Sequence, residues 1–168
     1  MFFRRDIMEN RYSIKNFLPL IFIFFIILLF CFLRQLYTPG MHAFMYDFMG
    51  AFFIVFGCFK AANLRAFVSA YTMYDLLAQK STIYAYTYPF IEVVLGMLYL
   101  ARWYPVFTNI VTISIMLVGM VSVIRALRVH EQIMCACLGV VFKIPMTYVT
   151  LLEDVIMFVM AVWMLVVN

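Results

Sequence analysis

The chain has 168 residues, of which 68% are hydrophobic and 12% are charged, and it carries a formal net charge of +4. Its mean hydropathy is +1.06. A soluble domain of this length needs far more charged residues on its surface, so this composition excludes a soluble protein. Because the apolar stretches are continuous rather than alternating with polar residues, they predict transmembrane helices and exclude a membrane β-barrel.

Five apolar stretches approach the roughly 20 helical residues that a bilayer core about 30 Å thick requires. In chain order they are 16–35, 43–59, 82–101, 104–124 and 145–167. Basic residues precede the first stretch, as they would in a signal peptide. The apolar part is longer than the roughly 7–15 residues of a signal peptide, and no cleavage pattern of small residues follows it, so we interpret it as a retained anchor.

The expected fold is therefore an all-α integral membrane protein, with a four-helix transmembrane bundle and one extra N-terminal helix. Residues 1–40 form the basic N-terminus with its anchor, and residues 41–168 form the four-helix domain. The segment 60–80 joins the second and third spans, and its apolar residues recur at helical spacing. Near 63–79 this pattern predicts either a helix along the membrane surface or an amphipathic connector that docks on the bundle.

The distribution of basic residues favours an orientation with the N-terminus inside and the C-terminus outside, because Lys and Arg resist translocation. In this orientation only Arg34 and Arg102 lie outside. The inside set is Arg4, Arg5, Arg11, Lys15, Lys60, Arg65, Lys80, Arg125, Arg128 and Lys143. Insertion alone explains the positive charge, so nucleic acid is not an expected partner. The expected location is the bacterial inner membrane, with the loop 125–144 on the cytoplasmic side.

Four carboxyl groups lie within the predicted spans: Asp47, Glu92, Glu153 and Asp154. A charge at the centre of a membrane helix costs about 2.5–3.5 kcal/mol or more, so each of these groups requires an explanation. Placed at several depths, they would suit a route for protons or cations. The alternative is that each carboxyl is protonated or bonded to a neighbouring helix in a structural role.

Methionines recur on one face of several spans. The sequence has 14 of them, and Met146, Met157, Met160 and Met164 share a helical face with Glu153. Thioethers are soft ligands suited to Cu(I), so such a series could conduct an ion. The alternative is that they fill the spaces between packed helices.

Two cysteines, Cys135 and Cys137, occur in the stretch QIMCACLGVVFKIPM at 132–146. In extended backbone both side chains point the same way, so they could bind Cu(I), Zn(II) or Hg(II), with Cys58 as a third sulfur and Met134 or Met146 as a weaker fourth ligand. Alternatively, a disulfide at this spacing would be strained and therefore labile and oxidising. A third alternative is inert packing. No glycine-rich phosphate loop and no hydrolase or transferase motif is present, which leaves a thiol-redox factor as the candidate enzyme activity.

Three stretches resemble the MauE/DoxX-type redox-associated membrane proteins. They are FMGAFFIVFGCFKAANLRAFVSAYTMYDLLAQ, YPFIEVVLGMLYL and CACLGVVFKIPMTYVTLLEDVIM, and together they extend over roughly 41–167. The resemblance implies a bundle of four core membrane helices. For MauE itself it implies a role in processing, transport or maturation of the small subunit of methylamine dehydrogenase, a periplasmic protein rich in disulfides.

Two functional hypotheses follow. In the first, the chain is a maturation factor for an exported redox protein or thiol carrier, in which Cys135 and Cys137 exchange electrons while Glu92 and Glu153 move protons. In the second, it carries a soft metal through Cys58, Cys135, Cys137, Met146 and Met157. The candidate cofactors are accordingly a quinone or Cu(I), and a packing subunit of a larger complex is a third alternative. Oxidative maturation requires outward-facing thiols. Since the charge distribution places the cysteines inside, either they accept electrons or metal from the cytoplasm, or the orientation is reversed, or quinone chemistry occurs within the bilayer.

Overall fold

The computed structural model describes residues 14–128 and 147–167, and within these residues it contains helices and no strands. The helices are α2 (Ile14–Gln35), α3 (Met41–Ala62), α4 (Leu64–Tyr74), α5 (Thr82–Ala101), α6 (Pro105–Arg128) and α7 (Thr147–Val167). Helices α2, α3, α5 and α6 are long and apolar enough to cross a membrane. Helix α7 has 21 residues and corresponds to the fifth predicted span. The prediction of an all-α membrane bundle is confirmed.

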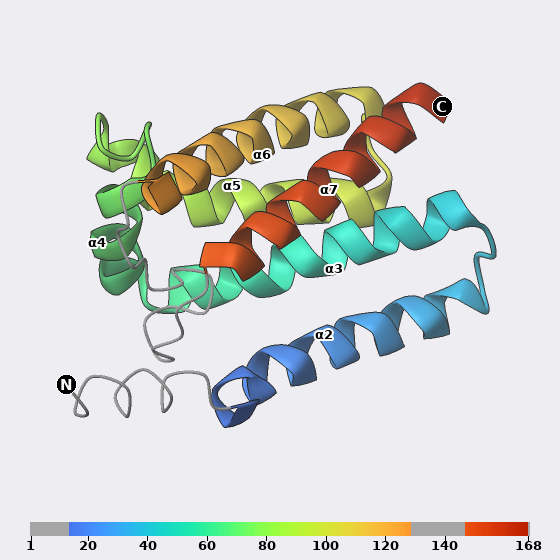
Figure 1. Cartoon of the computed structure of the whole chain (residues 1–168). Coiled ribbons are helices and arrows are strands. Elements are labelled where there is room, and N and C mark those ends of the chain that lie inside the picture. Colours follow the sequence, from blue (N-terminus) through green and yellow to red (C-terminus); the bar gives the residue numbers. More distant parts are fainter. Residues whose placement is uncertain (1–13, 129–146, 168) are drawn as a thin grey trace.

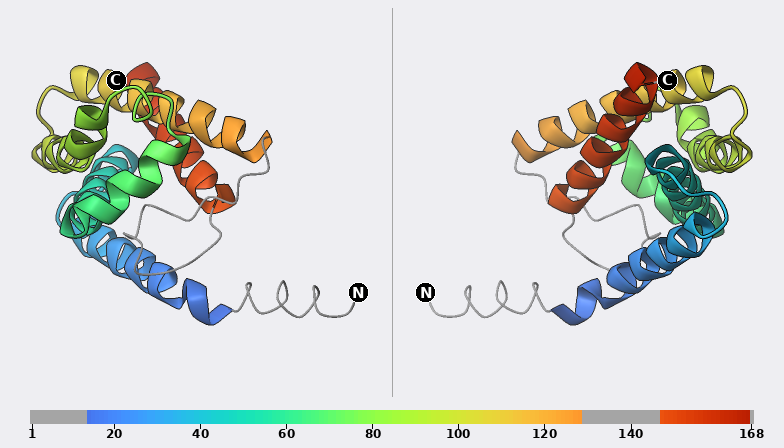
Figure 2. Two further views of the ribbon diagram at one scale, coloured as in Figure 1. Left: turned by 90° about the vertical axis from the view of Figure 1, so that its left-hand side faces the viewer. Right: turned by 90° about the vertical axis from the view of Figure 1, so that its right-hand side faces the viewer.

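The bundle consists of α3, α5, α6 and α7, and α2 lies beside it (Figure 1). Helix α3 packs most extensively against α5, and α6 packs most extensively against α7. Helix α2 packs against α3, on one side of the bundle (Figure 2). Two predicted spans are longer in the structure, because α3 continues to Ala62 and α6 continues to Arg128.

Glycines allow α3 and α5 to approach closely. A Cβ atom on Gly96 would lie 2.8 Å from the carbonyl oxygen of Gly50, and one on Gly50 would lie 3.0 Å from the carbonyl oxygen of Gly96. About two helical turns further along α3, a Cβ atom on Gly57 would lie 3.0 Å from the carbonyl oxygen of Pro89. Small residues at a helix interface let the backbones come together, which is how membrane helices gain van der Waals contact.

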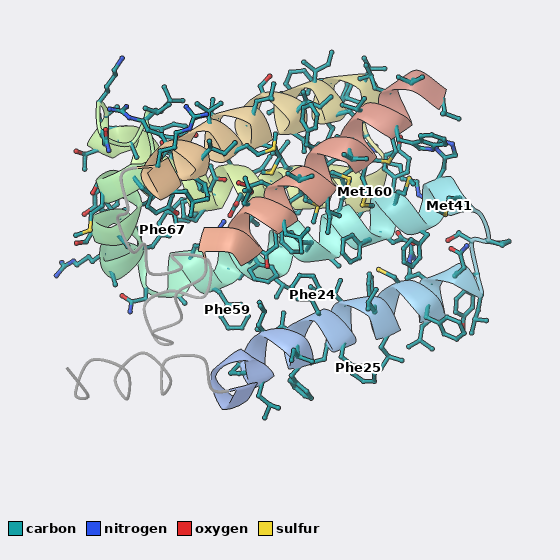
Figure 3. The ribbon with its side chains drawn as sticks, viewed as in Figure 1. Phe24, Phe25, Met41, Phe59, Phe67 and Met160 are labelled. Carbon is teal, nitrogen blue, oxygen red and sulfur yellow. The ribbon has the colours of Figure 1, made fainter. Side chains whose placement is uncertain are left out.

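Aromatic side chains fill the space between α2 and the bundle. The ring of Phe24 lies 5.9 Å from that of Phe52 and 6.0 Å from that of Phe56, measured between centroids. Phe24 points from α2 toward α3, whereas Phe25 points away and is 61% exposed (Figure 3). A helix with one face packed and its other face apolar and exposed fits a lipid environment.

Helix α4 lies across one end of the bundle (Figure 1) and is shorter than the helix predicted near 63–79. Its buried residues Phe67, Val68, Tyr71 and Tyr74 form the face that packs toward α5 and α6. The turn after α4 is held by Asp75, whose Oδ1 accepts hydrogen bonds from the backbone of Leu77 and Ala78 at 3.0 and 2.8 Å. This face of α4 packs on the bundle, and a position of the helix along the membrane surface stays a prediction.

Candidate functional site

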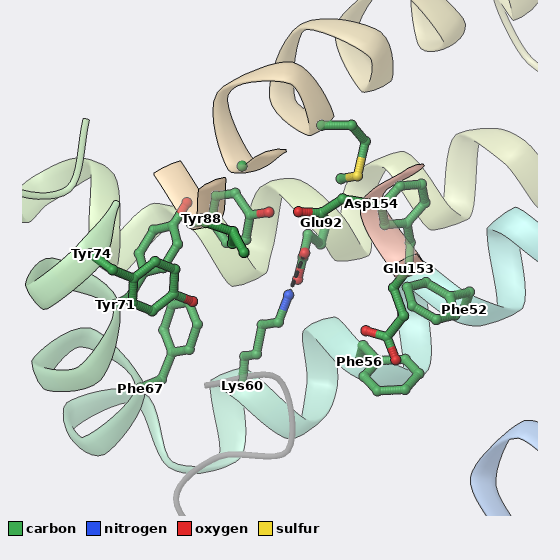
Figure 4. Close-up of a pocket in the computed structure, with 14 residues that line it drawn as sticks. Phe52, Phe56, Lys60, Phe67, Tyr71, Tyr74, Tyr88, Glu92, Glu153 and Asp154 are labelled. Carbon is green, nitrogen blue, oxygen red and sulfur yellow. Dashed lines mark hydrogen bonds and ion pairs between the residues drawn. The ribbon is translucent and has the colours of Figure 1, made fainter. Parts of the chain in front are cut away.

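A small cavity of about 40 Å³ lies at the α4 end of the bundle, lined by residues of α3, α4, α5, α6 and α7 (Figure 4). We call it the Lys60 pocket. Among the described residues that line it, the charged ones are Lys60, Glu92, Glu153 and Asp154, and most of the others are aromatic. A cavity of this size holds only one or a few water-sized groups.

At the centre of the pocket, the Lys60 ammonium group forms an ion pair with Glu92 Oε1. Both residues are buried, with 7% and 3% of their surface exposed. The Lys60 Nζ atom also lies 5.1 Å from the ring centroid of Tyr88 and 5.9 Å from that of Phe67. A desolvated ammonium group gains from the faces of such rings as well as from the carboxylate. The pair is therefore held by charge on one side and by aromatic faces on the other.

The close packing of α3 and α5 positions this ion pair. Gly57 precedes Lys60 by three residues on α3, and Pro89 precedes Glu92 by three residues on α5. Residues three apart lie on the same face of a helix. Because the two helices run in opposite directions, Glu92 lies near the level of Gly57, which contacts Pro89 and Val93, and the long Lys60 side chain, tilted toward the start of α3, reaches back to it.

A glycine on α6 makes room for a second carboxylate. A Cβ atom on Gly119 would lie 2.9 Å from Asp154 Oδ2, so any larger residue there would displace this side chain. Asp154 is close enough to interact electrostatically with Lys60 and Glu92. Glu153 is 9% exposed and lies beside Phe56 in the pocket (Figure 4).

Tyr71 of α4 closes the pocket at the end of the bundle. Its ring centroid lies 4.8 Å from that of Tyr88 and 5.0 Å from that of Phe67. Burial, followed by the neighbouring Tyr88 and Tyr84, raises the pKa of Tyr71 well above its usual range. Its hydroxyl is therefore neutral and can act only as a hydrogen-bonding group at physiological pH.

The fourth carboxyl group, Asp47, lies at the other end of α3. It is fully buried, and its Oδ1 lies 3.4 Å from Arg34 Nη2 and 3.9 Å from Arg102 Nη2. At about 1.5 Å per residue, the 13 positions between Asp47 and Lys60 place the two sites about 20 Å apart. The four carboxyls therefore lie at two levels, which differs from the expected series of depths. Arg34 and Arg102, the two basic residues that the charge distribution assigns to the outside of the membrane, therefore both lie close to the Asp47 carboxylate.

The residues proposed from sequence as thiol or metal sites are only partly described. Cys135, Cys137 and Met146 lie outside the described residues. Cys58 is exposed on α3, and Met157 is 1% exposed in a core that also contains Met49, Met116 and Met164. Such surroundings are typical of packing methionines, and a metal-ligand role for Met157 stays a prediction. Among residues 14–128 and 147–167, no group of three or more His, Cys, Asp and Glu side chains is arranged to hold a metal ion.

Sequence reasoning identified Glu92 and Glu153 but missed Lys60, which it interpreted as the end of a span and as a cytoplasmic charge. Lys60 lies in the last turn of α3 and is buried, and its place on the cytoplasmic side stays a prediction. The signal that could have found it is the need of a membrane-buried Glu92 for an opposite charge. Tyr88 and Phe67 carried no distinguishing signal, since aromatic residues are frequent throughout this chain.

A family model described as methylamine utilisation protein MauE matches residues 38–167. The match includes α3 to α7, and hence the whole Lys60 pocket, and it leaves α2 outside. No curated protein and no solved structure gives a significant match.

Proposed function

We propose a thiol-exchange function for this chain, which belongs to the methylamine utilisation protein MauE family and is a membrane protein. In this proposal Cys135 and Cys137 process an exported partner of the type of the methylamine dehydrogenase small subunit. The observation that carries the proposal is the family match, because residues 38–167 include both cysteines.

The chemistry is a pair of disulfide exchanges. A thiolate of the partner attacks one sulfur of a Cys135–Cys137 disulfide, a mixed disulfide forms, and the other cysteine leaves as a thiolate. A second partner thiolate then attacks the mixed disulfide, so the partner gains a disulfide while the cysteine pair gains two electrons and two protons. A membrane quinone, reduced in turn to its quinol, or the disulfide of a thiol carrier would reoxidise the pair.

The Lys60 pocket supports this proposal through its position. Helix α6 ends at Arg128 and α7 begins at Thr147, and these are the described residues on either side of 129–146. Val123 of α6 and Glu153 of α7 line the pocket, five and six residues from those ends. Carboxyl groups near a thiol exchange can take up or deliver the protons that the exchange moves, and we assign this role to Glu92 and Glu153.

The test is the accessibility and redox state of the cysteine pair in intact cells. A variant with Cys31→Ser and Cys58→Ser retains only Cys135 and Cys137 and is treated with a membrane-impermeant maleimide, with and without a mild reductant. Because oxidative maturation requires outward-facing thiols, we expect labelling from outside only after reduction, together with disulfide formation in the partner. This outcome would reverse the orientation that the basic residues favour. Labelling that requires permeabilisation and no reductant would contradict the proposal.

Two further cysteine variants separate thiol exchange from soft-metal transport. Cys58 is a proposed ligand in the metal hypothesis only, so Cys58→Ser should leave partner disulfide formation unchanged while the double change Cys135→Ser, Cys137→Ser abolishes it. Loss of function in Cys58→Ser, accompanied by loss of Cu(I) binding, would favour the metal carrier instead.

A further inference from the structure

Two arginines share one carboxylate at the end of the bundle opposite α4. Arg34 of α2 and Arg102, the C-cap of α5, each direct an Nη2 atom toward Asp47 Oδ1, at 3.4 and 3.9 Å. We call these three residues the Asp47 cluster. The α2–α3 loop and the α5–α6 turn lie at the same end of the molecule (Figure 1), and Arg102 joins them by donating to Thr38 Oγ1 at 3.4 Å. The cluster therefore places two positive charges against one negative charge where the two loops meet.

The carboxylate holds the two guanidinium groups from beneath and leaves them accessible from outside. Asp47 is fully buried, whereas the side chains of Arg34 and Arg102 are 41% and 39% exposed. Within residues 14–128 and 147–167, both arginines bond only through Nη2, so the Nη1 group of each keeps its N–H donors. Neighbouring guanidinium groups with such donors are suited to a phosphate group, whose oxygens accept several hydrogen bonds at once.

The backbone of the α5–α6 turn fixes the position of Arg102. This residue has the left-handed conformation, with φ 55° and ψ 34°, and Tyr104 has φ 47°. The left-handed region favours glycine, which is the usual residue just after the end of a helix. Arginine is strained there, but unlike glycine it has a side chain that reaches Asp47 and Thr38. The strained turn therefore holds a guanidinium group beside that of Arg34.

The residues around the cluster are those of a membrane interface. Tyr37, Trp103 and Tyr104 closely follow the two arginines in sequence and are 85%, 65% and 75% exposed. Exposed Trp and Tyr side chains at the ends of membrane helices are typical of the level at which lipid headgroups lie. Phe32, two residues before the arginine of α2, is exposed as well and has the apolar character that acyl chains cover. A lipid phosphate is therefore the anion that this position favours over a phosphate from solution.

We propose that Arg34 and Arg102 together bind the phosphodiester group of an anionic phospholipid such as phosphatidylglycerol. One such group matches the excess charge of the Asp47 cluster, whereas a zwitterionic lipid brings a further positive charge toward the arginines. The bound lipid joins α2 to the end of α5, beside the link that Asp47 already makes. The proposal goes beyond the thiol function and does not depend on Cys135 or Cys137.

The first test uses Trp103, which is next to Arg102, as a reporter of the neighbouring lipid. The full chain with Trp163→Phe retains Trp103 as its single tryptophan and is reconstituted in phosphatidylcholine bilayers that contain a minor fraction of brominated lipid. We expect brominated phosphatidylglycerol to quench the Trp103 fluorescence several-fold more effectively than brominated phosphatidylcholine. Inorganic phosphate, added at constant ionic strength, should not reverse this quenching. Equal quenching by the two lipids, or full reversal by inorganic phosphate, would overturn the proposal.

The second test repeats the quenching measurement with arginine variants. Arg34→Gln and Arg102→Gln should each weaken phosphatidylglycerol binding roughly tenfold, because one guanidinium group is lost. Either variant suffices if the other does not fold. The matched control is Arg65→Gln on α4, which removes the same charge from an exposed position at the other end of the bundle and should leave the lipid preference unchanged. An unchanged preference in Arg34→Gln or Arg102→Gln, or an equal loss in Arg65→Gln, would overturn the proposal.

Discussion

The Lys60–Glu92 ion pair provides the sharpest test of the structure, through a double-mutant cycle with Lys60→Met and Glu92→Leu. Both side chains are nearly buried, with 9% and 4% of their surface exposed. Removing one partner of a buried pair leaves an uncompensated charge, which costs about 3–5 kcal/mol. Lys60→Met also removes the two cation–π contacts, at about 1 kcal/mol each. We therefore expect Lys60→Met to destabilise the protein by about 5–7 kcal/mol.

The double variant should be much less destabilised than the sum of the single variants. Replacing both partners of a buried pair with apolar groups of similar volume is often nearly neutral, so its loss is mainly the cation–π contribution of about 2 kcal/mol. The free energy of unfolding is measured by reversible denaturation in micelles or by steric trapping in bilayers. The expected coupling energy is at least about 3 kcal/mol. Additive effects, with coupling below about 0.5 kcal/mol, would refute the pairing of Lys60 with Glu92.

Three further variants test other parts of the fold by the same unfolding measurement. Gly96→Leu should destabilise the α3–α5 contact by about 2–3 kcal/mol or more, because the new Cβ would meet the backbone of Gly50. The exposed Ala101→Leu on the same helix is its control, and equal effects of the two would contradict the close packing. Asp47→Asn should cost about 1–2 kcal/mol and increase proteolysis between α2 and α3. Thr38→Ala, which removes the hydrogen bond that Thr38 accepts from Arg102 and the one that it donates to the Arg34 carbonyl, should not. Asp75→Ala should cost about 2–3 kcal/mol, because the backbone N–H groups of Leu77 and Ala78 lose their acceptor and the Ser122 hydroxyl keeps only the Val118 carbonyl. A loss no larger than that of Ser122→Ala would argue against this role.

The Lys60 pocket and the Asp47 cluster, which consists of Asp47, Arg34 and Arg102, have different roles in the protein. The Asp47 cluster joins α2 to the bundle and to the residue that follows α5, since Arg34 belongs to α2 and Arg102 is the C-cap of α5. Both arginines are about 40% exposed, so water screens part of the interaction. Lys60 and Glu92 in the Lys60 pocket are 7% and 3% exposed, so their electrostatic interaction is less screened by water. Chemistry is therefore expected at the pocket, and helix attachment at Asp47.

The amino-acid sequence by itself determined the fold class and the approximate limits of the long helices. The reason is that a bilayer sets a required length and composition for each span, and 16–35 or 82–101 satisfy both without reference to any neighbour. The sequence also identified Glu92 and Glu153 as unusual, because an ionisable group in an apolar span is costly wherever the span packs.

Only the tertiary structure decided which polar groups meet. Lys60 and Glu92 are 32 residues apart, and their contact depends on the close approach of α3 and α5 at Gly57 and on the rotation of each helix about its axis. Similarly, Asp154 reaches the pocket because Gly119 of α6 leaves space for it. Hydropathy constrains where a helix crosses the membrane but hardly constrains its rotation or its neighbours, since lipid and protein interiors are about equally apolar. The partner of each buried charge was therefore fixed by helix packing.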